Sequence, residues 1–183
     1  MEENDDAYRS NGTTMSALVH PIPPVCDGNS EILILGSFPS VKSREAAFYY
    51  GHPRNRFWRV VAAVFEQDVP RTTEEKIAFL LRNRIALWDV IASCEIEGSA
   101  DQTIRSAVPN DLTPILRAAD IRQIFVNGRK AEQLYNRLIA PKTGRKAICL
   151  PSTSPANAAK SLDQLIEAWR VIRRPESSGD GRE

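Results

Sequence analysis

The amino-acid sequence predicts an α/β fold: a three-layer α/β/α sandwich around a mainly parallel sheet of about four strands. Two observations lead to this prediction. Short apolar runs bounded by turn residues alternate with segments of helical periodicity along the chain. The first run, residues 31–36 (EILILG), is apolar almost throughout, as is typical of a strand buried on both faces of a parallel sheet.

The elements are expected in a regular order. From the amino end, the sequence predicts strand 31–36, helix 56–65, helix 73–83, strand 85–88, helix 112–119, strand 121–126, helix 129–139, strand 146–150 and helix 161–172. The helices repeat apolar residues three or four positions apart, and helix 73–83 begins with a threonine of the capping type. Each strand is a short run that stops at Gly36, Asp89, Asn127 or Pro151.

Length and composition indicate one globular domain. The chain has 183 residues, of which 42% are hydrophobic and 26% charged, which is enough for a single buried core. We expect this domain at residues 20–172, entered through the extended, proline-rich segment 20–24. Residues 1–19 are expected to be a disordered arm and residues 173–183 a flexible tail.

Cysteine usage and hydropathy indicate an intracellular protein, cytoplasmic in a bacterium or nuclear in a eukaryote. Cys26, Cys94 and Cys149 are isolated from one another, which argues against a disulfide framework, a zinc site or an iron–sulfur cluster. No apolar run is long enough to span a bilayer, and no signal peptide opens the chain. We expect a monomer without a metal or a cofactor.

The loops that leave the carboxyl ends of the strands are the expected place for a ligand site. They begin at Gly36, Asp89, Asn127 and Pro151. The first loop, GSFPS, is neither GxGxxG nor GK[ST], so the sequence gives little support for a dinucleotide or a P-loop site. A domain that binds another small molecule remains open at this point.

Residues 48–58 (FYYGHPRNRFW) concentrate aromatic rings and bases around one asparagine. The basic residues of this region are Lys42, Arg44, Arg54, Arg56 and Arg59. Basic groups interleaved with aromatic rings are typical of a surface that binds phosphates and stacks on bases. The alternative, a solvated basic helix face, would explain the charges but not the rings.

Four motifs together resemble the uracil-DNA glycosylase superfamily, and most closely its deoxyinosine (hypoxanthine) DNA glycosylase branch, family six. The motifs are GSFPS, FYYGHPRNRFW, LWDV and LPSTSPAN, in the family's order over about residues 20–172. HPRNRFW also resembles the HPANRFW stretch of the mismatch-specific uracil glycosylases. The resemblance implies a DNA partner, a flipped base and hydrolysis of an N-glycosidic bond without a cofactor.

Two positions depart from the uracil-specific patterns. Phe38 stands where the family has an asparagine or aspartate that positions water, and Leu150 stands where the uracil branch has a histidine against the leaving base. The resemblance therefore points to Asn55 as the catalytic residue, which would either place the water or contact the leaving base. A turn-closing or helix-capping role for Asn55 is the alternative.

Base-binding residues are expected in the same loops. They are Ser37 and Phe38 in the first motif, Tyr50 as the ring that stacks on the base, and Asp89 as the acceptor for N1–H of hypoxanthine or N3–H of uracil. The other aromatic residues at 48–58 are expected mainly in the core, and His52 as a structural hydrogen-bonding residue. Capping of a following helix is the alternative for Asp89.

Contacts to the DNA backbone are expected from two places. Lys42, Arg54 and Arg56 would contact phosphates, as would Ser152, Thr153 and Ser154, with Asn157 as the candidate wedge. Excision of hypoxanthine is the leading prediction. The alternatives are excision of uracil or another deaminated base, and a relative that binds nucleic acid without catalysis.

Overall fold

The computed structural model describes residues 17–95 and 104–173. Its strands are β1 (Ala17–Val19), β2 (Ile32–Gly36), β3 (Ile85–Asp89), β4 (Ile91–Glu95), β5 (Arg105–Pro109), β6 (Gln123–Asn127) and β7 (Ala147–Leu150). Its helices are α1 (Val41–Glu45), α2 (Phe57–Val64), α3 (Thr73–Arg82), α4 (Thr113–Ala118), α5 (Arg129–Leu138), α6 (Ala140–Thr143), α7 (Leu162–Trp169) and a 3-10 turn, η2 (Arg170–Ile172).

The central sheet has the order β3-β2-β6-β7, and all of its neighbouring strands are parallel. This confirms the predicted four-stranded parallel sheet. The register pairs Gly36 with Asp89 and Asn127 with Leu150. All four predicted strand ends therefore meet at one edge, which is where ligands bind in such folds.

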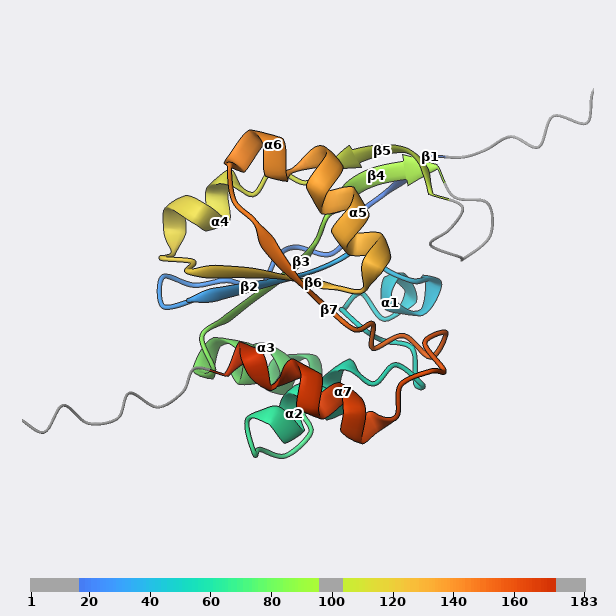
Figure 1. The fold of residues 1–183 in the computed structure, drawn as a ribbon, viewed down its shortest axis with the longest axis vertical. Coiled ribbons are helices and arrows are strands. Elements are labelled where there is room, and N and C mark those ends of the chain that lie inside the picture. Colours follow the sequence, from blue (N-terminus) through green and yellow to red (C-terminus); the bar gives the residue numbers. More distant parts are fainter. Residues whose placement is uncertain (1–16, 96–103, 174–183) are drawn as a thin grey trace, which may run out of the picture.

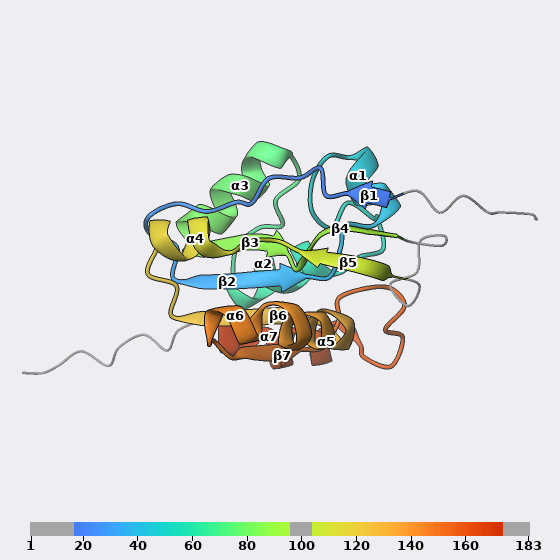
Figure 2. The same cartoon turned by 90° about the horizontal axis from the view of Figure 1, so that it is seen from above.

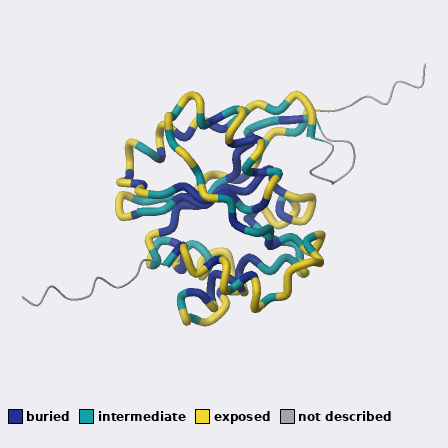
Figure 3. Tube along the Cα trace, in the orientation of Figure 1, coloured by how far each residue is buried: buried dark blue, intermediate teal, exposed yellow. Residues whose placement is uncertain are grey.

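Two buried layers enclose the sheet, because successive side chains of β2 point to opposite faces. Ile34 packs into the cluster that α2, α3 and α7 form, whereas Leu33 and Leu35 pack against α4 and α5. Figure 1 shows these helix groups on the two sides of the sheet, and Figure 3 shows the buried residues concentrated along the strands between them. The apolar run in residues 31–36 is thus explained by burial on both faces.

A second sheet of three antiparallel strands, β1-β4-β5, was not predicted. Its β4 begins two residues after β3 ends, so Asp89 precedes a strand and does not cap a helix. Residues 17–19, expected in the arm, form β1 and pair with β4 at Ser93 to Glu95. These strands are three to five residues long and mostly half-exposed, so no apolar periodicity marks them. Residues 1–16 of the predicted arm and 174–183 of the tail lie outside the described residues.

The second sheet lies near the carboxyl ends of the parallel strands. In Figure 2 the β2 arrow points toward the side where β1, α1 and the loop that follows β7 are found. The backbone N–H of His20, just after β1, donates to Ala92 O in β4 at 2.7 Å. This bond carries the amino-terminal segment across the end of β3.

Gly128 connects β6 to α5 in a conformation that only glycine adopts readily. Its φ is +93° and its ψ 165°, and a Cβ atom there would lie 2.9 Å from Ser152 Cβ. Its N–H donates to Leu150 O at 2.8 Å, which fixes the end of β7 beside it. The glycine therefore sets the spacing between two of the loops at the carboxyl edge.

Replacing Gly128 with alanine should lower the free energy of unfolding by roughly 2–4 kcal/mol, because backbone strain and a steric clash act together. Gly144→Ala is the matched control: its φ is +67° and the space around it is open. That variant should lose only about 1 kcal/mol. Urea denaturation measures the free energy of unfolding of both variants. Equal losses in Gly128→Ala and Gly144→Ala would show that a clash with Ser152 does not contribute.

Candidate active site

A pocket of about 380 Å³ opens at the carboxyl edge of the parallel sheet. It is lined by the β2–α1 loop, the segment before α2, the ends of β3 and β6, and the loop after β7. The lining residues are Gly36, Ser37, Phe38, Pro39, Ser40, Ser43, Tyr49, Tyr50, Asn55, Asp89, Asn127, Ser152, Thr153, Ser154 and Ala156. All of the predicted base-binding residues and the predicted catalytic residue are therefore in one pocket.

Tyr50 is an aromatic wall of this pocket. Its ring stacks on Phe57, with 4.0 Å between centroids and 17° between the planes. Its backbone has a positive φ of 54°, an uncommon conformation for a tyrosine. Phe57 therefore covers one face of the Tyr50 ring. Phe48, Tyr49, Phe57 and Trp58 are buried in the core, as expected.

Tyr49 lines the pocket but its hydroxyl is used inside the protein. The hydroxyl donates to Pro23 O at 2.8 Å. Burial, followed by the charge of Asp89, raises the pKa of the Tyr49 phenol far above its usual value. Tyr49 is therefore a neutral anchor for the proline-rich segment and cannot act as an acid or base near neutral pH.

Phe38 and Ser37 line the pocket, and both are buried. The Arg44 guanidinium carbon lies 5.7 Å from the centroid of the Phe38 ring, and Arg44 Nη1 donates to Pro39 O at 2.8 Å. Arg44 thus braces the loop that carries Phe38. Phe38 gives this part of the pocket an apolar surface.

Asp89, at the end of β3, forms a buried pair with His20. The distance from His20 Nε2 to Asp89 Oδ2 is 2.8 Å, and only 3% and 5% of the two side chains are exposed. The backbone N–H of Ile22 donates to His20 Nδ1 at 3.2 Å, so Nδ1 is an acceptor and the ring proton is on Nε2. A neutral imidazole therefore donates to Asp89, and no group of residues 17–95 and 104–173 donates to Oδ1 of this carboxylate in the contacts of the pocket.

The backbone around Asp89 allows this close packing. A Cβ atom on Gly36 would lie 2.3 Å from Asp89 Oδ1, so only glycine fits beside the carboxylate. The amide of Asn110 donates to Asp89 O at 2.9 Å and to Ile91 O at 3.2 Å, which holds the turn between β3 and β4. The backbone of the turn is therefore held by Asn110, and the carboxylate itself is held by His20.

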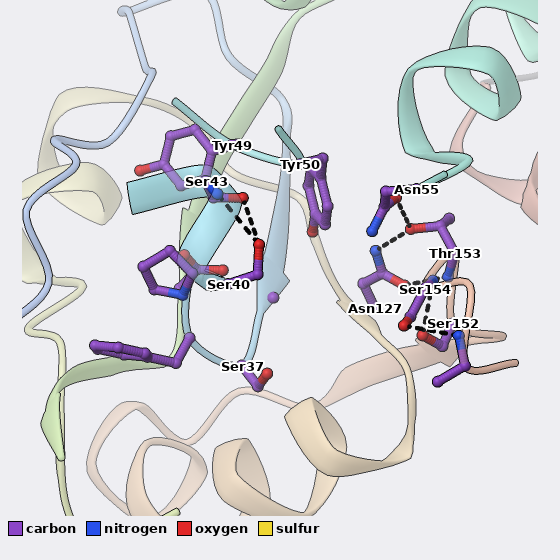
Figure 4. Close-up of a pocket in the computed structure, with 15 residues that line it drawn as sticks. Ser37, Ser40, Ser43, Tyr49, Tyr50, Asn55, Asn127, Ser152, Thr153 and Ser154 are labelled. Atoms are coloured by element: carbon purple, nitrogen blue, oxygen red, sulfur yellow. Dashed lines mark hydrogen bonds between the residues drawn. The ribbon is translucent and has the colours of Figure 1, made fainter. Parts of the chain in front are cut away.

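Asn55 has its side-chain oxygen fully engaged. Asn55 Oδ1 accepts from the backbone N–H of Phe57 at 2.9 Å and from the hydroxyl of Thr153 at 3.0 Å. The first bond is the helix-start role that the sequence allowed. Figure 4 shows this oxygen turned toward Thr153 and the amide nitrogen on another side. Within residues 17–95 and 104–173, no protein group bonds to Asn55 Nδ2, which leaves two donor hydrogens at the pocket.

Thr153 connects Asn55 to the central sheet. Its backbone N–H donates to Asn127 Oδ1 at 3.1 Å, and Asn127 Nδ2 donates to Thr153 Oγ1 at 3.0 Å. Thr153 is fully buried and its hydroxyl is used on both sides. Its residue type and loop had predicted a contact to a phosphate. Its position corrects that prediction: it is an internal link between β6, the loop after β7 and Asn55.

Arg56 was also expected at a phosphate, and in this structure its side chain bonds to backbone carbonyls. Its guanidinium donates to Ser154 O at 2.9 Å, Asn157 O at 2.8 Å and Lys160 O at 2.5 Å. Its backbone N–H donates to Thr153 O at 3.1 Å. One side chain therefore holds together the loop that follows β7.

Asn157, the candidate wedge, also serves this loop, because Asn157 Nδ2 donates to Ser152 O at 2.9 Å. The hydroxyl oxygens of Ser152 and Ser154 accept from the backbone N–H groups of Ser154 and Ala156, both at 3.2 Å, so their hydroxyl hydrogens remain as donors. The loop surface at residues 155–156 and 158–160 is exposed.

Of the other predicted phosphate contacts, Arg54 is exposed beside the pocket and Lys42 is exposed in α1. The ammonium of Lys42 lies 2.8 Å from Glu45 Oε2, with 57% of each side chain exposed, so this surface pair is weak and can be exchanged for a phosphate. His52 Nδ1 accepts from the backbone N–H of Arg54 at 3.1 Å, the structural role expected for it.

Asn127 and His20 are among the polar residues of the pocket region that were not predicted as site residues from the sequence. Asn127 stands directly after a predicted strand at the carboxyl edge, and that position could have identified it. His20 carries no such signal, because it reaches Asp89 only through the unpredicted second sheet. In the described ranges, no group of three histidine, cysteine, aspartate or glutamate side chains could hold a metal ion, and no helix is long and apolar enough to cross a bilayer.

Comparison with known proteins gives consistent matches. Residues 23–173 match the uracil DNA glycosylase superfamily. A hypoxanthine DNA glycosylase of Methanosarcina acetivorans is 40% identical over 154 residues, 83% of this chain and 96% of the relative. One from Methanosarcina barkeri is 36% identical over 150 residues, 80% and 92% of the two chains.

A solved structure agrees with these matches. The solution NMR structure of a Methanosarcina acetivorans protein, provisionally assigned as a uracil DNA glycosylase, has a TM-score of 0.70 to this chain. The two are 35% identical, and the match covers 85% of this chain and 99% of the other. The α/β fold is therefore shared over nearly the whole of that protein.

Removing the Arg56 side chain should loosen the loop after β7. Arg56→Ala is expected to cost roughly 1.5–3 kcal/mol of unfolding free energy, because three carbonyls lose a charged donor. Amide hydrogen exchange at residues 153–160 should rise with it. Arg54→Ala is the matched control and should stay within about 0.5 kcal/mol of the parent. If both variants behave alike, Arg56 is not the clamp of this loop.

Proposed function

Because the chain belongs to the uracil DNA glycosylase superfamily, we propose that it is a DNA repair glycosylase that excises hypoxanthine, the base of deoxyinosine. The enzyme flips the nucleotide out of the helix and hydrolyses the N-glycosidic bond, leaving an abasic site. The similarity to two hypoxanthine DNA glycosylases over most of both chains supports this substrate. The proposed partner is DNA, and the chain acts as a monomer inside the cell without a cofactor.

One observation carries the proposal: the pocket pairs an acceptor with a donor. Asp89 Oδ1 can only accept, and Asn55 Nδ2 can only donate. Hypoxanthine has a hydrogen on N1 and acceptors at O6 and N7. Adenine has no hydrogen on N1 and carries an amino group at C6. The polarity of the pocket therefore favours the deaminated base.

The reaction needs a base held in place and charge stabilised on it as it leaves. The oxygen of a water bonds to C1′ while the C1′–N9 bond breaks, and the bonding electron pair passes to the base. The base takes up a proton as the water loses one. Asn55 Nδ2 donates to the leaving base, Tyr50 stacks on it and Asp89 orients its N1–H. Such preorganised donors act strongly in a site that excludes water.

The DNA backbone is proposed to lie across the exposed groups around the pocket. Arg54 and Lys42 would contact phosphates on the side of the aromatic loop. The hydroxyl groups of Ser152 and Ser154 would donate on the side of the loop after β7. Flipping costs a few kcal/mol and is cheapest at a mispaired base such as hypoxanthine, which adds to selectivity.

The decisive experiment compares substrates on one protein. Oligonucleotides that carry a single deoxyinosine, deoxyuridine or deoxyxanthosine are incubated with the protein, and alkali then cleaves any abasic site. Cleavage at deoxyinosine supports the proposal. Cleavage only at deoxyuridine would make the protein a uracil glycosylase, and binding without cleavage would make it a non-catalytic relative.

Asn55→Ala should slow excision of hypoxanthine by about 10²–10³-fold in single-turnover conditions, because one preorganised donor is lost. The affinity for DNA should change little, since phosphate contacts dominate it. Asn136→Ala, an exposed position in α5, is the matched control and should keep the parental rate. An alanine variant at position 55 that excises at the parental rate would make Asn55 purely structural.

Asp89→Asn should lower the excision rate by roughly 10–100-fold, the effect of losing one hydrogen bond to a charged group. An asparagine can still accept from His20 through its oxygen, but its nitrogen then faces the base and cannot accept from N1–H. Fluorescence anisotropy with inosine-containing DNA should give a nearly unchanged Kd. Asp120→Asn, at a carboxylate whose side chain is 86% exposed, is the control. If Asp89→Asn keeps the parental excision rate, Asp89 does not contribute to recognition of the base.

A further inference from the structure

We propose that Thr153 and Asn127 are positioning residues that fix the Asn55 amide as a donor to the leaving base. This inference rests on the proposed function and deepens it. A side-chain amide can present either its oxygen or its nitrogen to a ligand, and the two orientations have nearly the same shape. For Asn55 the choice decides between placing water and contacting the base.

The chain of hydrogen bonds has only one consistent direction, because it starts from backbone N–H groups. The N–H of Thr153 must donate, so the Asn127 atom 3.1 Å from it is the oxygen. The other end of that amide is then the nitrogen, which donates to Thr153 Oγ1 at 3.0 Å. With its oxygen accepting there, the Thr153 hydroxyl has its hydrogen left for Asn55 at 3.0 Å.

The second backbone donor gives the same answer independently. The N–H of Phe57 lies 2.9 Å from the same Asn55 atom, which must therefore be the oxygen. Both lone pairs of Asn55 Oδ1 are then used. The amide nitrogen is the part that can reach a ligand, so Asn55 does not accept from an attacking water. The two bonds to the oxygen also polarise the amide and strengthen its N–H groups as donors.

The burial of this network keeps its direction fixed. Thr153 is fully buried, so no water competes for its hydroxyl. Three separate parts of the chain meet in it: the segment before α2, the end of β6 and the loop after β7. Arg56 adds a fourth link, since its N–H donates to Thr153 O at 3.1 Å.

The first test removes or restores the Thr153 hydroxyl hydrogen. Thr153→Val should slow single-turnover excision of hypoxanthine by about ten-fold, the size expected for one hydrogen bond, with Kd for inosine-containing DNA unchanged. Thr153→Ser keeps the hydroxyl and should recover the rate to within about three-fold. Thr143→Val removes the hydroxyl of Thr143 in α6, which donates to Ile139 O at 3.2 Å, and should not change the rate.

Asn127→Asp is the sharper variant, because it preserves size and the bond from the Thr153 N–H. A carboxylate at position 127 cannot donate to Thr153 Oγ1. The Thr153 hydroxyl should therefore donate to the new carboxylate, so that only its lone pairs face the Asn55 oxygen. We expect an excision rate at least as low as that of Thr153→Val. The added negative charge also weakens DNA binding, and the salt dependence of Kd measures that effect separately. This variant carries the test if Thr153→Val does not fold.

A binding measurement separates this inference from the proposed function. In the parent, free hypoxanthine should bind more tightly than free adenine. In Asn127→Asp that preference should fall by up to about ten-fold, the worth of one hydrogen bond, because only the Phe57 N–H then holds the Asn55 oxygen and the amide can more easily turn to accept from the adenine amino group. If the unsubstituted protein does not excise hypoxanthine from DNA, the proposed function is refuted. The other outcome is that the parent is active and that Thr153→Val and Asn127→Asp keep its rate and its base preference. That result would refute the positioning role and leave the proposed function standing.

Asn55→Asp completes the test of direction. Its carboxylate can still accept from Phe57 and Thr153 and could orient water, but it cannot donate to the base. The donor role requires a loss of rate close to that of Asn55→Ala. Retention of the parental rate by the aspartate would show that Asn55 places water, and would overturn the inference.

Discussion

The pocket depends on the contact between two loops that are about a hundred residues apart in the chain. The segment before α2 carries Asn55 and Arg56, and the loop after β7 carries Thr153. Neither loop belongs to the central sheet, so its position is not fixed by strand pairing. Arg56 donates to three carbonyls of the loop after β7, and the Thr153 hydroxyl in that loop donates to Asn55 in the segment before α2. The geometry of Asn55 is thus set by polar contacts between loops, with the sheet supplying Asn127 as the fixed point.

The sequence was sufficient to predict the parallel sheet, because β2, β3 and β6 are largely buried and are mostly apolar. The edge strand β7 is also an apolar run, although it stays partly exposed. The run at Leu33, Ile34 and Leu35 is the clearest case, since its residues divide between two cores. The antiparallel sheet could not be predicted in this way. Its strands are short and half-exposed, and the backbone pairing that defines them leaves little trace in side-chain pattern. Because this sheet was not predicted, His20 was not predicted as the partner of Asp89.

Residue type predicted the pocket better than it predicted individual roles. Asn55, Asp89, Tyr50 and Phe38 line one pocket because their motifs end at the same edge of the sheet. Arg56, Thr153 and Asn157 were expected at the DNA backbone, since basic and hydroxyl groups in loops suit phosphates. In the structure their partners are carbonyls and amides of the protein, and a contact to DNA stays a prediction for Arg56 and Asn157. A sequence does not show which polar groups a fold leaves unsatisfied, and loops without regular structure have many carbonyls that need a donor.

Asp89 and Asn55 solve the same problem of polarity by different means. A carboxylate accepts whatever its orientation, so His20 and Gly36 only have to hold it in place. An amide must also be oriented, and the protein does this with the N–H groups of Phe57 and Thr153, which can only donate. Hypoxanthine and adenine present opposite patterns at N1 and C6. Under the proposed function Asp89 therefore rejects adenine at N1, and Asn55 rejects it where the amide donates to O6. Each such contact discriminates by about 1–3 kcal/mol, and two together with the lower cost of flipping a mispaired base give the selectivity that a repair enzyme needs against the normal base.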